Sequence, residues 1–166
     1  MNSWQMFGSA IVLVAALTAC PGGNPGGNGN NNPTTATVNF SNPSNVGSFD
    51  TTSFTGTSVA VTGMENGEAA TAITISTGSG ATARAFSALI IPKVTAPTTC
   101  TLSSTSKCLV TLIQTGGVTA TQSGTITISA LQGSSFTFAV NAVLNVGGGG
   151  TVTLSTNGTI NNYQVP

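Results

Sequence analysis

The chain has 166 residues, and only 4% of them are charged: three are basic, three are acidic, and the formal net charge at pH 7 is zero. A typical domain carries about 25% charged residues, so the solvent-facing surface here must consist mainly of Thr, Ser, Asn and Gly. The lack of a basic surface excludes electrostatic binding to nucleic acid. The absence of histidine excludes both a Ser-His-Asp triad and a histidine-bound metal ion.

The first nineteen residues end in an apolar stretch, residues 7–19, that runs directly into Cys20. This stretch is too short to span a bilayer, which needs about 20 apolar residues, but it fits the apolar region of an export signal. Residues 1–9 contain no Lys or Arg, which departs from the usual basic start of such a signal. The sequence Leu17-Thr18-Ala19-Cys20 resembles a bacterial lipobox. The resemblance implies that residues 1–19 are a lipoprotein signal peptide and that Cys20 carries covalent diacylglycerol and acyl lipid.

The next segment, residues 20–33, consists of Cys20 followed by Gly, Asn and Pro alone. Such a composition buries too little apolar surface to offset the chain entropy lost on folding, so we expect a disordered linker. A flexible chain of this length spans roughly 20 Å. The lipobox and the linker together predict a domain that is exported to the cell envelope and tethered by lipid. We expect the outer membrane or the cell surface rather than the inner membrane.

Beyond residue 33 the sequence alternates with a period of two and shows no convincing helical period. The Asn66-Gly67 pair predicts a two-residue hairpin turn, because both residue types tolerate positive φ. Residues 86–91 form a more continuous apolar run. Short strands at this spacing predict an all-β sandwich or barrel. The alternating apolar residues are Val38 and Phe40, Val59 and Val61, Ile73 and Ile75, Val110 and Leu112, Ile126 and Ile128, and Phe136, Phe138, Val140, Ala142 and Leu144.

A run of four glycines, residues 147–150, precedes the last segment of the chain. Val152 and Leu154 alternate there, and Asn157-Gly158 offers a second hairpin turn. We therefore predict a Gly-hinged C-terminal hairpin over residues 147–166. We expect it to belong to the main domain of residues 34–146, because an isolated hairpin is marginally stable at best.

Cys100 and Cys108 are the only cysteines besides Cys20. In an exported chain an even pair indicates a disulfide, and a loop this short would stabilise the domain by roughly 2–3 kcal/mol. The spacing does not fit a Cys-x-x-Cys redox motif, and a metal site would need histidine or further cysteine. We therefore predict a structural disulfide.

Residues 99–112, TCTLSSTSKCLVTL, and residues 124–129, GTITIS, resemble a pattern that recurs in bacterial surface proteins. Residues 58–62 and 72–75, on either side of Asn66-Gly67, are similar to the N-terminal half of the same module. The module is the immunoglobulin-like type related to the abnormal-spindle, hydin and major-sperm-protein group. Ile113-Gln114 departs from the Phe-x-Pro usual there, and Gly63-Met64 departs from the usual Asn. The resemblance implies an antiparallel immunoglobulin-like β-sandwich of about seven to nine strands, and it implies no chemistry.

Few residues could support catalysis or ligand binding. Glu65 and Glu68 flank the predicted turn and could reach one cation together, but solvated side chains are the expected interpretation. Lys93 and Lys107 have no motif that would make them part of a Ser–Lys dyad. Sugar-binding platforms usually present Trp or Tyr, and Tyr163 is the only tyrosine. We expect no enzyme activity, no metal ion, no cofactor apart from the lipid, and no small-molecule substrate.

Protein–protein assembly is the function that these exclusions favour. Natural sheets protect their edges with charge, proline or bulges, and this domain has few charges. We predict that an edge strand pairs with another chain, either a protein partner or a second copy, by β-augmentation. A surface-exposed adhesin or ligand-binding module is the alternative. The predicted partner-binding edge is Thr151, Val152, Thr153, Leu154 and Ser155, with residues 159–165 as the alternative edge.

Overall fold

The computed structural model describes residues 34–41, 53–103, 106–114, 117–146 and 150–161, and Tyr163. The predicted signal peptide, the lipidation residue Cys20 and the linker lie outside the described residues.

The described chain is all-β, as predicted, and its only helical element is the short 3₁₀ turn η1, Gly80–Thr82. Its nine strands are antiparallel. They are β1 (Thr34–Phe40), β2 (Ser53–Glu65), β3 (Glu68–Thr77), β4 (Arg84–Ile90), β5 (Thr98–Ser103), β6 (Cys108–Gln114), β7 (Gly117–Gln132), β8 (Ser135–Val146) and β9 (Gly150–Ile160).

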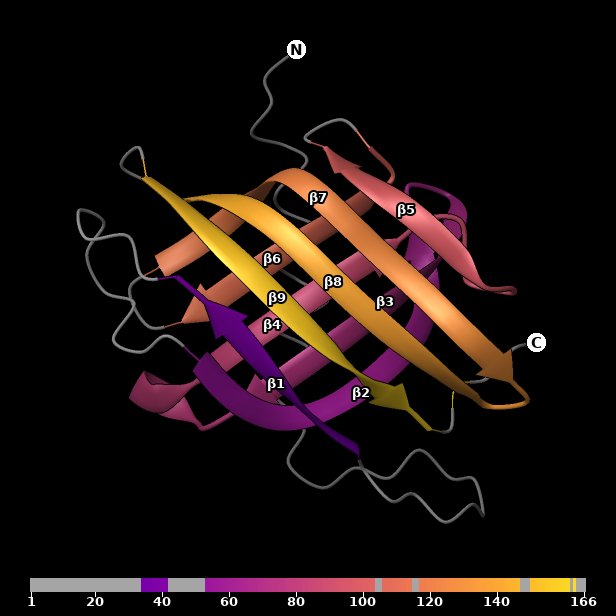
Figure 1. Ribbon diagram of the computed structural model, residues 1–166, viewed down its shortest axis with the longest axis horizontal. Helices are drawn as coiled ribbons and strands as arrows, with labels where there is room; N and C mark the ends of the chain where they lie inside the picture. Colours follow the sequence, from indigo (N-terminus) through magenta and orange to yellow (C-terminus); the bar gives the residue numbers. More distant parts are fainter. Residues whose placement is uncertain are drawn as a thin grey trace. The chain divides into compact units, whose positions relative to one another are not determined.

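The strands form one nearly closed sheet in the order β5-β7-β6-β4-β3-β2-β1-β9-β8, and a further pairing of β7 with β8 closes the ring (Figure 1). The long strand β7 makes this closure possible. One of its edges pairs with β8 over most of its length, and the register shifts between Thr121 and Ser123. It also pairs first with the end of β6 and then with β5. β6 pairs with residues 117–118 of β7 and β5 pairs with residues 123–128, so both strands lie along the same strand β7. The end of β4 lies beside the start of β6, and the loop from β4 to β5 connects these two parts of the sheet.

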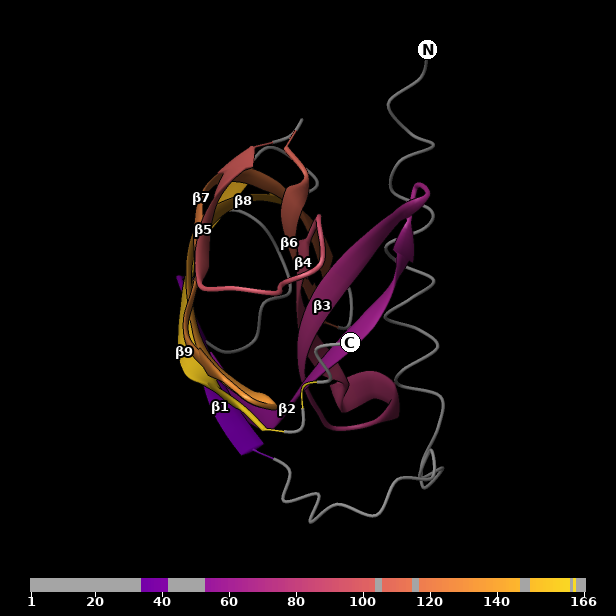
Figure 2. The ribbon, with the colours of Figure 1, turned by 90° about the vertical axis from the view of Figure 1, so that its right-hand side faces the viewer.

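The main core lies between two curved walls of the sheet, with β9, β8, β7 and β5 on one side and β6, β4 and β3 on the other (Figure 2). The alternation in β8 is regular: Phe136, Phe138, Val140, Ala142, Leu144 and Val146 are buried. Each of these side chains joins the same hydrophobic cluster. The predicted period-two pattern is therefore confirmed where it is longest.

The hairpin predicted at Asn66-Gly67 is confirmed. Glu65 at the end of β2 pairs with Glu68 at the start of β3. Asn66 has φ 52° and Gly67 has φ 82°, so both central residues occupy the left-handed region that a two-residue hairpin turn requires.

The second predicted hairpin, at Asn157-Gly158, is wrong. β9 continues through both residues, with Asn157 opposite Thr37 of β1 and Gly158 opposite Phe138 of β8. A Cβ on Gly158 would lie 3.0 Å from the ring of Phe138 and 3.1 Å from the Cβ of Ala36. The glycine gives the buried ring of Phe138 room for a close approach, and the main-chain pairing of β9 overrides the local turn preference.

Candidate functional site

The junction of β6 and β7 is the most unusual part of the sheet. The two strands pair through Ile113 with Val118 and through Gln114 with Gly117, after which the main-chain ladder between them stops. The same register would place Leu112 opposite Thr119 and Val110 opposite Thr121. At these positions threonine hydroxyls replace the main-chain partner.

Each of the two threonines bonds one residue of β6 twice. The N–H of Val110 donates to Oγ1 of Thr121 at 2.6 Å, and this hydroxyl donates back to the carbonyl of Val110 at 2.8 Å. Thr119 makes the same pair of bonds with Leu112, at 2.9 and 3.3 Å. Both threonines are buried. Their hydroxyls provide hydrogen-bond partners for the N–H and carbonyl groups of Val110 and Leu112. They thereby close the gap between β6 and β7, which we call the seam.

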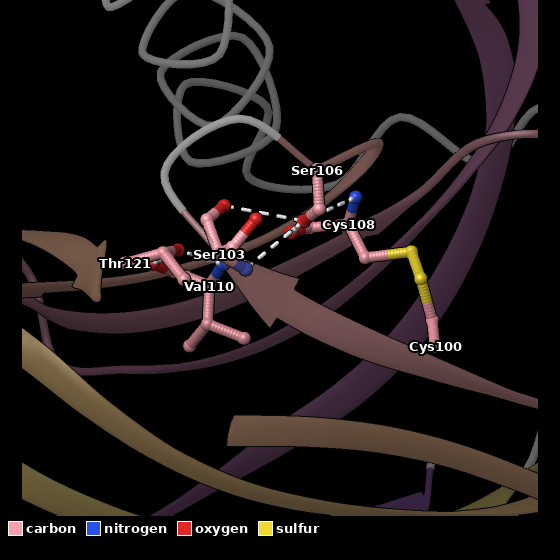
Figure 3. The surroundings of a disulfide bond; sticks show 6 residues. All are labelled: Cys100, Ser103, Ser106, Cys108, Val110 and Thr121. Carbon is pink, nitrogen blue, oxygen red and sulfur yellow. Dashed lines mark hydrogen bonds between the residues drawn. A yellow bond between two sulfur atoms is a disulfide. The ribbon is translucent and has the colours of Figure 1, made fainter. Parts of the chain in front are cut away.

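The predicted disulfide is present at the other end of this seam. Cys100 of β5 and Cys108 of β6 are bonded, with their Cα atoms 6.3 Å apart, which lies within the usual range (Figure 3). Cys108 is fully buried. β5 pairs with β7 and β6 pairs with β4, so the disulfide covalently joins the two walls.

Ser106 organises the short connection between the two cysteines (Figure 3). Its hydroxyl accepts from the N–H of Ser103 at 3.1 Å and from the N–H of Cys108 at 3.2 Å, and it lies 2.6 Å from the carbonyl of Cys108. These bonds hold the turn between β5 and β6. The disulfide, Ser106 and the two threonines together form a structural closure without a titratable group.

A second buried polar cluster surrounds Tyr163. Its hydroxyl donates to the carbonyl of Val94 at 2.7 Å, the hydroxyl of Thr71 lies 2.7 Å from the tyrosine oxygen, and the N–H of Val94 donates to Thr71 at 3.0 Å. Because the tyrosine has only one proton, Thr71 is the donor to Tyr163. Burial raises the pKa of Tyr163 above its ordinary value near 10, while the Thr71 bond acts in the opposite direction. The cluster ties the chain after β9 to the segment after β4.

Two of the charged side chains, those of Glu68 and Lys107, form an ion pair. The carboxylate of Glu68 binds the ammonium of Lys107 at 2.5 and 2.6 Å, and both side chains are exposed. No group of three or more metal-ligating residues occurs among the described residues.

A shallow hollow of about 690 Å³ lies over β1, β9, β8 and β7. Gly124 is one of its lining residues, and its polar side chains are amides and hydroxyls. A Cβ on Gly124 would lie 2.1 Å from the carbonyl oxygen of Asn141, so only glycine fits there. The polar residues that line it are Asn39, Ser41, Asn141, Thr153 and Ser155.

The predicted partner-binding edge, residues 151–155, is not an open edge at Leu154 and Ser155, whereas Thr151 and Val152 pair with β8 alone among the described residues. β9 lies between β8 and β1, so Leu154 and Ser155 have neighbours on both sides. The carbonyl of Thr153 accepts the N–H of Ser41 at 2.9 Å, and Thr153 donates its own N–H to the Ser41 hydroxyl at 3.0 Å. The prediction failed because the glycine run and the Asn157-Gly158 pair suggested a short hairpin, whereas β9 is one continuous strand from Gly150 to Ile160.

No match is found when the chain is compared with protein-family models, with curated protein sequences and with solved structures. Among the described residues, no helix has the length and apolar character needed to cross a membrane.

Proposed function

We propose that this chain is an exported, lipid-anchored envelope protein without enzyme activity, and that its β-domain acts in protein–protein assembly at the outer membrane or cell surface. The observation that carries the proposal is the sequence Leu17-Thr18-Ala19-Cys20, which follows an apolar stretch and precedes a Gly/Asn linker. The linker would place the domain roughly 20 Å from the lipid.

Two features of the domain support an exported location. A disulfide joins Cys100 and Cys108, and such bonds persist mainly in oxidising compartments outside the cytoplasm. The exposed surface is also formed largely by hydroxyl and amide side chains. A domain with so few titratable groups is better suited to binding than to acid–base chemistry.

The finer fold assignment belongs to the same proposal. We propose that the sheet is a variant of the immunoglobulin-like module that residues 99–112 and 124–129 resemble. The two curved walls and the covalent link between them support this assignment (Figure 2). The module would supply a rigid scaffold, and its function would reside in its exposed strands and loops.

The test of the anchor uses the full chain and a Cys20→Ala variant in the native host. We expect the mass of the mature wild-type protein to correspond to cleavage before Cys20 plus added lipid, and the protein to fractionate with membranes. The variant should retain residues 1–19 and carry no lipid. An unlipidated wild-type chain in the soluble fraction would refute the proposal.

The hollow around Gly124 favours a second candidate, a surface-exposed adhesin or ligand-binding module. Its amide and hydroxyl lining could bind a polar ligand such as a saccharide. Protease treatment of intact cells separates the two functions, because an adhesin must be accessible from outside. Gentle detergent extraction followed by native mass measurement would instead reveal a stoichiometric complex.

A further inference from the structure

The second half of β2 is a strand segment that pairs on a single side. β2 runs from Ser53 to Glu65, but its pairing with β1 ends where Thr34 meets Ser58. The following seven residues, 59–65, pair with β3 alone among the residues that the structure describes. Figure 2 shows this part of β2, in purple, extending with β3 away from β1.

The chain's own upstream sequence is a poor partner for this edge. Continuing the β1–β2 register by one residue would put Pro33 opposite Val59, and proline has no N–H to contribute to a ladder. Residues 22–32 are Gly and Asn apart from one proline, and these residue types are depleted in strands. Residues 22–33 are therefore unsuited to extend β1 along residues 59–65 of β2.

The side chains of this segment are those of an interaction surface. Val59 and Met64 are the exposed large hydrophobic residues of the described chain, with 38% and 68% of their surface accessible. Val61 lies on the outer face, where it begins a row that continues across the sheet through Ala72, Leu89 and Leu109. This row forms a hydrophobic cluster separate from the main core. An added strand next to β2 would extend the row.

We propose that the edge formed by residues 59–65 pairs with the same edge of a second copy of this chain. The antiparallel register with the longest overlap places Thr62 opposite Thr62 of the other copy, a favourable cross-strand pair. Glu65, the only charged residue of the segment, then lies opposite Val59, so no like charges meet. A two-fold arrangement of this kind closes on itself as a dimer.

Such a dimer would be the assembly of the proposed function, on which the proposal rests. Tethering by lipid confines the copies to one surface and raises their effective concentration. The zero net charge of the chain leaves no long-range repulsion between copies. A partner with a strongly charged strand would find no complementary charge on this edge except near Glu65, so a second copy fits better.

Cross-linking through Thr62→Cys in the full chain, in membranes from the expressing cells, tests the register. Thr62 is exposed, so the change should not disturb folding. We expect a disulfide-linked dimer under mild oxidation. Thr57→Cys is the matched control, since Thr57 is exposed on the same strand but lies where β1 already pairs. The Thr57→Cys control and the parent chain should give no disulfide-linked dimer. Cross-linking of Thr57→Cys equal to that of Thr62→Cys, or none from Thr62→Cys, would overturn the proposal, whereas a disulfide-linked dimer of the parent chain would mean that Cys20 is unlipidated and would contradict the anchor.

A second variant tests the same edge by repulsion. Thr62→Lys places two like charges opposite each other in the dimer, and we expect its dissociation constant to rise about two- to fivefold. Thr57→Lys should leave it unchanged. Equal effects of the two lysines on the native mass would overturn the proposal. If Cys20 carries lipid but the Thr62→Cys chain does not cross-link, the proposed dimer is wrong and the proposed anchor stands. If the Thr62→Cys chain cross-links but Cys20 carries no lipid, the proposed anchor is wrong and the proposed dimer stands.

Discussion

Replacing Tyr163 by phenylalanine should destabilise the domain although the ring stays in place. The ring packs edge-to-face on Phe136 with 4.9 Å between the centroids, and phenylalanine preserves that contact. The hydroxyl is lost, so the carbonyl of Val94 and the hydroxyl of Thr71 each lose a buried partner. Leaving a buried polar group unsatisfied costs about 1–3 kcal/mol. We expect the free energy of unfolding to fall by about 2 kcal/mol, and Tm by roughly 6–10 °C.

Thermal and urea unfolding, followed by circular dichroism, measure this change. Thr71→Val and the double variant complete a double-mutant cycle, and we expect a coupling energy above about 0.5 kcal/mol because the two hydroxyls touch. If Tyr163→Phe costs less than about 0.5 kcal/mol, or if its effect simply adds to that of Thr71→Val, the hydrogen-bond account is incorrect.

The same residue predicts a dependence on alkaline pH. The pKa of Tyr163 is raised in the folded state, so the neutral phenol is favoured by folding. Its contribution to stability is complete below the unfolded pKa of about 10, and it is lost as the pH rises through the folded pKa. The wild-type protein should therefore lose stability above about pH 10, and Tyr163→Phe should lose less. If the free energy of unfolding falls equally with pH in the wild type and in Tyr163→Phe, the alkaline loss of stability does not come from Tyr163.

Two further predictions concern the seam between the walls. Thr121→Val removes the hydrogen-bond partner of the Val110 N–H and carbonyl, and we expect the free energy of unfolding in urea to fall by about 1–3 kcal/mol. The control Thr101→Val changes an exposed threonine without such bonds and should lower it by less than about 0.5 kcal/mol. Reduction of the Cys100–Cys108 disulfide should lower the free energy of unfolding by roughly 2–3 kcal/mol, measured with and without a reducing agent; an unchanged unfolding midpoint would show that the bond does not stabilise the fold.

The sequence predicts most of the strands because their buried residues alternate with polar ones. β8 and the β2–β3 turn follow directly from local chemistry: period-two apolar residues in one case, Asn66-Gly67 in the other. Gly158 shows where such reasoning fails. The same Asn-Gly pair that turns the chain at residue 66 lies in the middle of β9, because the space needed by Phe138 cannot be read from neighbours in the sequence.

The hydrogen-bonding role of the Thr119 and Thr121 hydroxyls could not be predicted for a related reason. In a chain this rich in threonine, the buried Thr119 and Thr121 look the same as exposed threonines. Their role depends on which backbone groups lie opposite them after β6 and β7 separate. Tyr163 offered one usable signal: it is the only tyrosine, and a buried tyrosine hydroxyl needs a partner.

The scarcity of charge and the closure of the sheet have the same physical basis. An open sheet needs charged residues or prolines to prevent its edges from pairing with other chains, whereas a ring has few edges to protect. Here β7 closes the ring, and threonine hydroxyls cover the β6 backbone where the ladder stops. The edge of β5 is held beside β6 by the disulfide and by Ser106. Residues 59–65 of β2 pair with β3 alone among the described strands, and their one charged residue, Glu65, lies at the end of the segment. This segment combines single-sided pairing with the exposed apolar side chains of Val59 and Met64, so association should be tested there first.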